Sequence, residues 1–294
     1  MAVLSFIKKL WYLLKTYVSP HIIQDTCQYF LLSGKRLTRT FPVEVHLTEH
    51  CNLNCKGCSH FSNLAGEEYL DPAAFEKDCE RLSQLTKKLY AFKLLGGEPL
   101  LHPRITEFTT IARKYFPRTP IQITTNGTLL TRQPEEFWLN CHKNKIKITI
   151  SQYPIKLDKV EIKRLAKKYK VALELVGTTE KDRMCKMPLD LEGAQNIQTS
   201  YKKCIMSWGM CVTLRDGRMY TCCTAAHIRF FNGYFHKNLP VCDKDYVDIY
   251  KIKSKKEIID FLCKPFPFCR FCRSQDTTFG EIWDISKKEI TEWV

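Results

Sequence analysis

The stretch VEVHLTEHCNLNCKGCSHF, residues 43–61, decides the fold. Its first residues alternate between apolar and polar side chains, a pattern that predicts a β-strand over residues 43–48. Cys51, Cys55 and Cys58 follow at the spacing CxxxCxxC, in the loop directly after this strand. Because the three thiols are close together along one loop, they can converge on a single four-iron cluster and leave one iron open for a ligand that is not protein.

A zinc site is the alternative interpretation, with His46, His50 or His60 as a fourth ligand. The chain has 15 cysteines in 294 residues, and its N-terminal residues do not follow the pattern of a secretory signal. Because cytoplasmic thiols are kept reduced, so many cysteines indicate metal or redox chemistry rather than disulfides. We therefore expect a cytoplasmic protein with no membrane-spanning segment, since lysines interrupt the apolar stretch near the N-terminus.

The formal net charge of +15 is compatible with nucleic acid, anionic lipid or a small acidic substrate. Nucleic acid is not expected, because the sequence contains no zinc finger, RNA-recognition signature or long arginine run. Residues 3–18 predict an amphipathic helix that packs on the protein body or, alternatively, contacts a membrane surface. Its apolar stripe consists of Leu4, Ile7, Trp11, Leu14 and Val18.

From residue 43, β-rich runs alternate with helical patterns, which predicts parallel strands joined by crossover helices in a partial or complete barrel. The predicted strands are 43–48, 91–95, 120–125, 145–151 and 171–176. Asp71 and Pro72 predict the start of the first helix, in which Cys79 is a core residue. Further helices are predicted around 105–115 and 158–169. We expect three parts: an N-terminal helical segment (1–40), a core (41–200) and a cysteine-rich tail (201–294).

A second motif lies in AFKLLGGEPLLHP, residues 91–103, where Gly96, Gly97, Glu98 and Pro99 follow the second predicted strand. Glycines allow a backbone to approach a ligand closely, and a carboxylate can accept hydrogen bonds from an ammonium group. The motif gains its specificity from its position after CxxxCxxC.

Together the two motifs resemble the radical S-adenosylmethionine (SAM) superfamily, over roughly residues 41–200. The resemblance implies a partial TIM-like (β/α)6 barrel and a [4Fe-4S] cluster on Cys51, Cys55 and Cys58. It further implies that SAM binds the open iron. The SAM-binding residues that it implies are Gly96, Gly97, Glu98, Pro99, Asn126 of a Thr-Asn-Gly turn, and Ser151 at the end of the fourth strand.

The resemblance also implies the chemistry: SAM is cleaved reductively to a 5′-deoxyadenosyl radical, which abstracts a hydrogen atom from substrate carbon. The electron would come from a donor such as flavodoxin or ferredoxin. One position departs from the family pattern, because the residue before the third cysteine is Gly57 rather than an aromatic residue. His60 or Phe61 could replace the missing contact with adenine.

In the tail, Cys204, Gly217 and Cys222 have the spacing C-x12-G-x4-C, and Cys269 and Cys272 form a later CxxC. This arrangement resembles the twitch and SPASM extensions of radical SAM enzymes. It implies an auxiliary [4Fe-4S] cluster on Cys204, Cys222, Cys269 and Cys272, for which a zinc site is again the alternative.

Local patterns predict two elements of the tail. Asp216-Gly217 indicates a β-hairpin turn, and Ser254 with Glu257 indicates a capped helix through Leu262. Cys223 and Cys185 are candidate hydrogen-atom donors to a substrate radical, although a free buried cysteine is more often a small apolar residue. Arg215, Arg218 and Arg229 could hold an anionic substrate.

We therefore expect a radical SAM enzyme that oxidises or epimerises a small molecule such as a sugar, cyclitol or nucleotide-linked sugar. A peptide-modifying maturase is the alternative, since a separate chain could recognise the peptide. The alternative of another class is a non-enzymatic, metal-stabilised basic binding protein.

Overall fold

The computed structural model describes residues 41–177, 183–208 and 211–294, so the predicted helix over residues 3–18 lies outside the described residues. Five parallel strands form the centre of the sheet, in the order β5-β4-β3-β2-β1. They are β1 (Val43–Thr48), β2 (Phe92–Gly96), β3 (Ile121–Thr125), β4 (Ile146–Ser151) and β5 (Ala172–Val176). Each of the five predicted strands agrees with the structure to within one residue at either end, and the predicted α/β class is confirmed.

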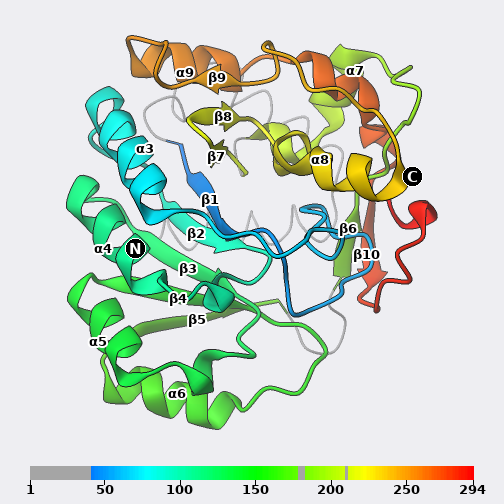
Figure 1. The fold of residues 1–294 in the computed structure, drawn as a ribbon. Helices are drawn as coiled ribbons and strands as arrows, with labels where there is room; N and C mark the ends of the chain where they lie inside the picture. Colours follow the sequence, from blue (N-terminus) through cyan, green and yellow to red (C-terminus); the bar gives the residue numbers. More distant parts are fainter. Residues whose placement is uncertain (1–40, 178–182, 209–210) are drawn as a thin grey trace, which may run out of the picture.

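Four helices cover one side of this sheet, and β6, β10 and α8 lie on the other side (Figure 1). The four are α3 (Pro72–Leu85), α4 (Ile105–Tyr115), α5 (Glu135–Lys143) and α6 (Lys159–Lys168). Asp71 caps α3 by accepting a hydrogen bond from the Ala74 amide at 3.2 Å, and Pro72 is its first residue, as the sequence predicts. Cys79 is fully buried in the core.

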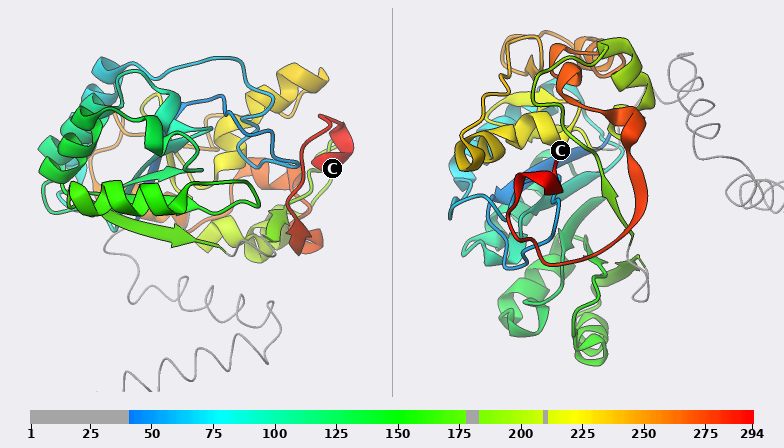
Figure 2. Two further views of the ribbon diagram at one scale, coloured as in Figure 1. Left: turned by 90° about the horizontal axis from the view of Figure 1, so that it is seen from below. Right: turned by 90° about the vertical axis from the view of Figure 1, so that its right-hand side faces the viewer.

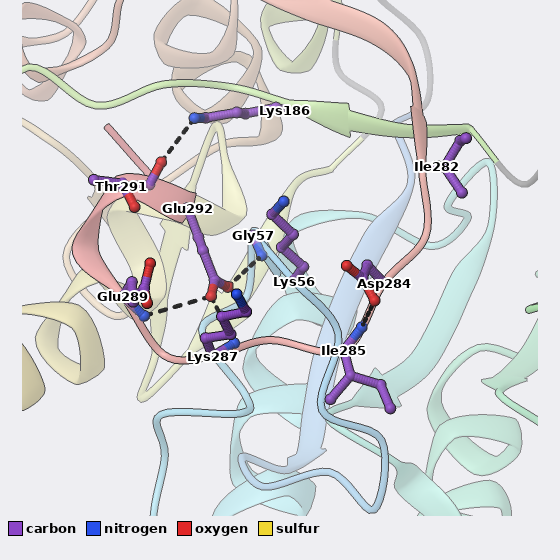
Figure 3. A pocket seen from close by; sticks show the side chains of 10 residues that line it. All are labelled: Lys56, Gly57, Lys186, Ile282, Asp284, Ile285, Lys287, Glu289, Thr291 and Glu292. Atoms are coloured by element: carbon purple, nitrogen blue, oxygen red, sulfur yellow. Dashed lines mark hydrogen bonds between the residues drawn. The ribbon is translucent and has the colours of Figure 1, made fainter.

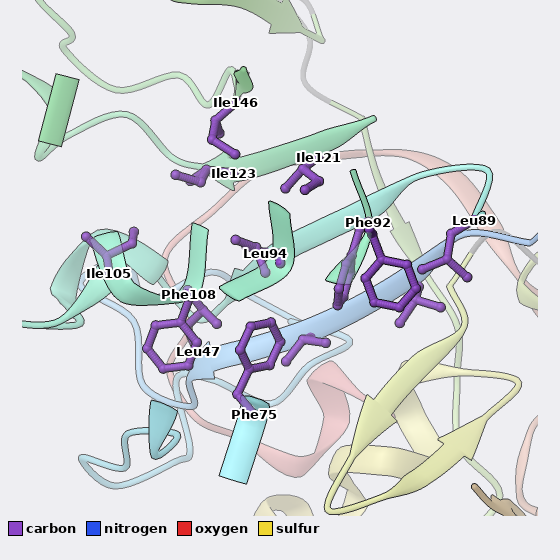
Figure 4. Packing of buried hydrophobic residues seen from close by; sticks show 14 of the residues in the cluster. Leu47, Phe75, Leu89, Phe92, Leu94, Ile105, Phe108, Ile121, Ile123 and Ile146 are labelled. Atoms are coloured by element: carbon purple, nitrogen blue, oxygen red, sulfur yellow. The ribbon is translucent and has the colours of Figure 1, made fainter. Parts of the chain in front are cut away.

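Alternation along the strands builds the core between sheet and helices (Figure 4). Leu47 of β1 and Phe92 of β2 are buried with Phe75 of α3 and Phe108 of α4. The Phe75 ring lies 5.9 Å from that of Phe92 and 5.1 Å from that of Phe108. Burying one such side chain stabilises the fold by about 1.5–3 kcal/mol, so this layer fixes the sheet on which the site is built.

The sheet continues from residues 41–200 into the tail. β7 (Thr213–Arg215) pairs in parallel with β1 through Glu44 and Thr213, and β8 (Arg218–Tyr220) and β9 (Val247–Asp248) extend the sheet in antiparallel fashion. Asp216 and Gly217 both have positive φ, 49° and 70°, which confirms the predicted hairpin turn. The division at residue 200 stays a prediction, because one sheet contains strands from both sides of it.

β6 (Arg183–Lys186) pairs with β10 (Thr278–Ile282), not with β5. In the described part of the chain β5 is therefore an edge strand, and the sixth strand of a (β/α)6 barrel is not found beside it. The physical reason is that the chain crosses after β5 to the tail, where β10 offers β6 a partner.

A second apolar cluster lies around Phe231, Phe266 and Phe268 and also includes Trp293 and Phe61 of the cysteine loop, which we define as residues 49–61. α7 (Ile197–Lys203) and α8 (Cys223–Phe235) contribute to this cluster, whereas the buried Ile258 and Leu262 of α9 (Lys255–Leu262) belong to the first one. The predicted capping box of α9 is present. Short 3-10 helices are η1 (Pro99–Leu101), η2 (Leu130–Arg132), η3 (Ile205–Trp208), η4 (Pro267–Phe271), η5 (Ser274–Asp276) and η6 (Ile290–Glu292). Among the described helices, none has the length and apolar character needed to cross a bilayer.

Candidate active site

A cavity of about 140 Å³ lies at the carboxyl ends of β1 to β4. The structure brings together there the three cysteines of the first motif and four of the six predicted SAM-binding residues. The lining consists of Cys51, Leu53, Cys55, Cys58, His60, Ser62, Asn63, Leu95, Gly96, Gly97, Thr124, Thr125, Asn126, Ser151 and Tyr153. The functional roles of these residues stay predictions, whereas their positions around one cavity are a property of the structure.

Cys51, Cys55 and Cys58 interact electrostatically with one another in every pair. Burial raises the pKa of Cys51 to about 12 and that of Cys55 to about 11, and it raises the pKa of Cys58 as well. Thiols in this environment need a nearby positive charge to become thiolates. Iron supplies that charge and prefers sulfur ligands, so the donor set fits an iron-sulfur cluster.

Gly96 and Gly97 are required by the approach of the cysteine loop to the end of β2. A Cβ atom on Gly96 would lie 2.2 Å from the Thr48 carbonyl oxygen, and one on Gly97 would lie 2.0 Å from the His50 carbonyl oxygen. Both contacts are with backbone, which cannot move aside as a side chain can. The glycines therefore permit a close backbone contact within the protein, in addition to any contact with a ligand.

Glu98 is fully buried beneath the cavity and is not among the lining residues. Its carboxylate accepts hydrogen bonds from the Thr125 hydroxyl (2.6 Å), the Asn126 amide (2.8 Å) and the Leu100 amide (3.1 Å). Burial raises the pKa of Glu98 to about 7, against the effect of these donors. Glu98 thus joins the ends of β2 and β3, while Pro99 begins the short helix η1.

Asn126 ties the cysteine loop to the end of β3. Its side-chain nitrogen Nδ2 donates to Asn52 Oδ1 at 2.8 Å and lies 3.9 Å from Cys51 Sγ. Its side-chain oxygen Oδ1 accepts a hydrogen bond from the Thr128 hydroxyl. Ser151, at the end of β4, faces the cavity from the opposite strand. Asn126 and Ser151, the two strand-end residues that the resemblance implies for SAM, therefore both line the cavity.

Gly57 has φ +62°, and a Cβ atom there would lie 3.0 Å from the Glu292 carbonyl oxygen. Both the positive φ and the close approach of the Glu292 carbonyl favour glycine at this position. Of the two proposed substitutes for an aromatic residue, His60 lines the cavity, whereas Phe61 is buried in the second apolar cluster against Phe231. His60 is also the only one of the three proposed zinc-ligand histidines that lines this cavity.

A buried network missed by the sequence analysis lies next to His60. His46 Nδ1 and His227 Nδ1 lie 3.0 and 3.2 Å from Glu49 Oε2, and the two rings stack with centroids 3.7 Å apart. Although burial opposes ionisation, hydrogen bonds with the two histidines hold the pKa of Glu49 below its usual range. His46, Glu49 and His227 have the geometry to hold a metal ion. Arg215 already supplies a positive charge there, since its guanidinium lies 3.4 Å from Glu49 Oε1 and 3.2 Å from His227 Nδ1.

The other two arginines considered for an anionic substrate also have protein partners. Arg229 forms an ion pair with Glu68, and the Arg218 guanidinium stacks over the Tyr246 ring at 4.6 Å.

The tail cysteines Cys204, Cys222, Cys269 and Cys272 form a second group. All six pairs among them interact electrostatically, and burial raises the pKa of each thiol. The structure thus brings together the four residues predicted for the auxiliary cluster.

Cys223 is fully buried at the start of α8, where its thiol hydrogen-bonds with that of Cys211. Glu44 and Lys93 act electrostatically on Cys211, so this thiol lies near the inner face of the sheet. The sequence analysis left Cys211 unassigned. Cys185, the other candidate donor, lies in β6 opposite Phe279 of β10.

The face of the sheet that points away from α3 to α6 is polar. The strand register aligns Glu44, Lys93, Gln122 and Lys147 in one row across β1 to β4. Lys93 and Glu44 form an ion pair of 2.6 Å. Thr124 lies on the same face of β3, two residues after Gln122 and nearer the carboxyl end of the strand, and it lines the cavity.

The fold and the site define an α/β protein whose thiol-lined cavity lies at the carboxyl ends of parallel strands. Residues 45–153 match the family model of the radical SAM superfamily, so this part of the chain is a radical SAM domain. A [4Fe-4S] cluster and SAM are the cofactors that a radical SAM domain implies.

The sequence is similar to that of a probable GTP 3′,8-cyclase from Pyrococcus abyssi (strain GE5 / Orsay), with 36% identity over 94 residues. A GTP 3′,8-cyclase from Mycobacterium ulcerans (strain Agy99) is 33% identical, also over 94 residues. These alignments cover 32% and 31% of this chain, and 29% and 26% of the relatives. The chain therefore spans less than a third of the length of the relatives it matches.

Two solved structures align over most of the chain. BtrN in complex with AdoMet and 2-DOIA has 17% identity and a TM-score of 0.49, covering 80% of this chain and 93% of that one. Native anSMEcpe with bound AdoMet has 15% identity and a TM-score of 0.44, covering 85% of this chain and 92% of that one.

Proposed function

We propose that this radical SAM enzyme takes a hydrogen atom from carbon of a polar small molecule, and so oxidises or epimerises a sugar, cyclitol or nucleotide-linked sugar. The observation that carries the proposal is the single cavity in which the thiols of Cys51, Cys55 and Cys58 meet the ends of β2, β3 and β4. When bound there, cluster and SAM supply a 5′-deoxyadenosyl radical as the hydrogen-abstracting species.

The residues of this chain bind and orient those cofactors. Cys51, Cys55 and Cys58 are the proposed ligands of the cluster, and the ends of β2 to β4 are the proposed binding site for SAM. Asn63 Oδ1 also lines the cavity and is buried without a partner among the described residues, so it is a suitable acceptor for a bound polar group. Glu98 acts by holding the Asn126 amide rather than from the cavity wall.

The polar inner face of the sheet supports the choice of substrate. Hydroxyl groups and phosphates need hydrogen-bond partners when they are removed from water, and an apolar face would leave them unsatisfied. The row from Glu44 to Lys147 offers both donors and acceptors. A nucleotide-linked substrate is within this class, in keeping with the name of the GTP 3′,8-cyclase relatives.

For an epimerisation, a thiol must return a hydrogen atom to the substrate radical. Cys223 and Cys185 are the proposed donors, and the contact with Cys211 favours Cys223. A hydrogen bond with Cys223, together with burial, raises the pKa of Cys211 well above its usual range. The Cys211 thiol therefore keeps its proton, and the Cys223 thiol beside it is fully buried.

Cys204, Cys222, Cys269 and Cys272 are the proposed ligands of an auxiliary [4Fe-4S] cluster, and a flavodoxin or ferredoxin is the proposed electron donor. The proposed compartment is the cytoplasm, where thiols stay reduced. Contact of residues 3–18 with a membrane surface stays a prediction.

Single-cysteine variants of the anaerobically reconstituted chain test the cluster assignment. We expect Cys51→Ala, Cys55→Ala and Cys58→Ala each to lose the electron paramagnetic resonance (EPR) signal that changes on adding SAM, whereas Cys269→Ala should keep that signal. Zinc instead of iron, or no SAM cleavage by the unsubstituted chain, would favour the metal-stabilised binding protein, whereas an unchanged signal in all four variants would contradict the proposed ligand set.

A panel of substrates deuterated at carbon tests the substrate class. Sugars, cyclitols, nucleotide sugars, GTP and peptides are incubated with enzyme, SAM and reductant, and 5′-deoxyadenosine is examined by mass spectrometry. Transfer of deuterium from a sugar, cyclitol or nucleotide sugar is expected, and transfer from peptides alone would favour a maturase. In deuterated water, deuterium in the product identifies thiol donation, which Cys223→Ala should abolish.

A further inference from the structure

The last residues of the chain cover the cysteine loop (Figure 2). We name residues 283–294 the C-terminal strap. Its backbone pairs with the loop through two hydrogen bonds: the Lys56 amide donates to the Asp284 carbonyl at 2.9 Å, and the Ser286 amide donates to the Asn54 carbonyl at 2.8 Å. Together they make Cys55 and Ile285 an antiparallel bridge. The strap is therefore bound to the same short loop that contains the cluster cysteines.

Glu292 fastens the far end of the strap (Figure 3). Its buried carboxylate accepts hydrogen bonds from the Gly57 amide at 3.3 Å, the Ser286 hydroxyl at 2.6 Å and the Lys287 amide at 2.7 Å. The Trp293 indole N–H donates to the Cys58 carbonyl oxygen at 2.9 Å. The strap thus has two tryptophans, and they contact the loop in different ways.

Trp283 is the tryptophan that reaches sulfur. Its indole N–H donates to Cys55 Sγ at 3.1 Å, across 228 residues of sequence. Cys51 and Cys58, by contrast, receive amide hydrogen bonds from their own loop, for example from Leu53 at 3.3 Å to Cys51 Sγ. Among the described residues, Trp283 is the hydrogen-bond donor recorded for the Cys55 sulfur.

The indole is held in place from two sides. Its backbone continues into the paired residues Asp284 and Ile285, and its ring lies 6.2 Å from that of Tyr153, which lines the cavity. A donor fixed in this way keeps the positive end of its N–H dipole directed at Cys55. Reduction adds negative charge to a cluster and its thiolates, and hydrogen bonds to the sulfurs stabilise that charge.

We propose that Trp283 raises the reduction potential of the [4Fe-4S] cluster on Cys51, Cys55 and Cys58 by donating its indole N–H to the Cys55 thiolate. Trp283 is a positioning and tuning residue rather than a catalytic one, because it contacts a ligand of the cluster. The inference rests on the ligand set proposed above. It makes the tail of the chain part of the SAM-cleaving site.

The test is a redox titration of the reconstituted full chain, followed by the EPR signal that responds to SAM. Trp283→Phe keeps an aromatic ring and removes the N–H. At a fixed potential we expect the ratio of reduced to oxidised cluster to fall about tenfold, which for one electron equals a midpoint about 59 mV lower. The matched control is Trp293→Phe, which removes an indole N–H that donates to a carbonyl. Its ratio of reduced to oxidised cluster should change by less than about twofold, which for one electron equals about 18 mV.

An unchanged midpoint in a fully loaded Trp283→Phe variant would overturn the inference, as would an equal fall in both variants. If Trp283→Phe does not load iron, the unsubstituted chain with ¹⁵N-labelled tryptophan decides, because pulsed EPR should detect a nitrogen coupled to the reduced cluster. Absence of that coupling also overturns the inference. A chain with no SAM-responsive cluster would instead contradict the proposed function.

Discussion

Substituting Gly97 with alanine should dismantle the cysteine loop. The added Cβ would lie 2.0 Å from the His50 carbonyl oxygen and 2.8 Å from the Cys51 amide nitrogen. Ordinary contact begins at 3.4 Å, so backbone must move by about 1.4 Å, the difference between 3.4 and 2.0 Å. That movement breaks the hydrogen bonds from the Gly97 amide to Thr48 (3.0 Å) and from the Glu98 amide to His50 (3.1 Å).

Each buried group left without a partner costs about 1–3 kcal/mol, so the expected loss of unfolding free energy is about 2–6 kcal/mol. This is a large share of the roughly 5–15 kcal/mol that stabilises a typical domain. Because Cys51 directly follows His50, its sulfur moves away from those of Cys55 and Cys58, and one cluster should be lost.

The assay combines thermal unfolding with iron and sulfide analysis after anaerobic reconstitution. We expect Gly97→Ala to lower the unfolding temperature by roughly 4–20 °C and to lose one four-iron cluster. The matched control is Gly66→Ala, since a Cβ at Gly66 meets nothing within 4 Å. If Gly97→Ala has the stability and iron content of the Gly66→Ala control, the close contact between β2 and the loop is refuted.

Four further substitutions have defined outcomes. Burial raises the pKa of Glu98 from 4.5 to about 7, so the stability that protonated Glu98 contributes is complete below pH 4.5 and is lost as the pH rises through 7. Urea unfolding of the iron-free chain should show that the free energy of unfolding falls by about 3 kcal/mol over this range, and that Glu98→Gln lacks this fall. Parallel pH curves for the two proteins would disprove this. Asn126→Ala should raise the KM for SAM at unchanged iron content, because the binding free energy of SAM weakens by about 1–2 kcal/mol. An unchanged KM would show that Asn126 is not part of the SAM site. Gly217→Ala, with φ +70° and a Cβ 2.6 Å from the Tyr250 ring, should destabilise by about 1–2 kcal/mol, whereas Gly233→Ala in open space on α8 should stabilise by about 0.5–1 kcal/mol; thermal unfolding that ranks them the other way contradicts the turn geometry.

Local patterns were sufficient to predict much of the fold. Alternation located β1 to β5, and Asp71 with Pro72 located the start of α3, because these signals depend on neighbouring residues alone. The pairing of β6 with β10 was not predictable in this way, since the paired residues lie 92 (Lys186 and Thr278) to 99 (Arg183 and Ile282) positions apart in sequence. α8 was missed because Cys222, its N-cap, and Cys223, its first residue, were interpreted as a cluster ligand and a hydrogen-atom donor rather than as a helix start.

The residues of the candidate site also differ in whether local sequence identifies them. Cys51, Gly97 and Asn126 lie in short motifs whose spacing indicates a shared end of the sheet. Trp283 and His227 reach the site only through tertiary structure, and nothing in their immediate sequence marks them. The glycine motif was predicted from close approach to a ligand alone. In the structure Gly96 and Gly97 also face backbone atoms of Thr48 and His50, a contact that no pattern within residues 91–103 could indicate.

The most direct test of the account is the formation of 5′-deoxyadenosine by anaerobically reconstituted protein with SAM and dithionite. We predict that the unsubstituted chain forms it and that the triple variant with alanine at Cys51, Cys55 and Cys58 does not. Equal formation by the two proteins, or none by the unsubstituted chain when it holds iron and sulfide, would contradict the central claim that these three thiols hold the SAM-cleaving cluster.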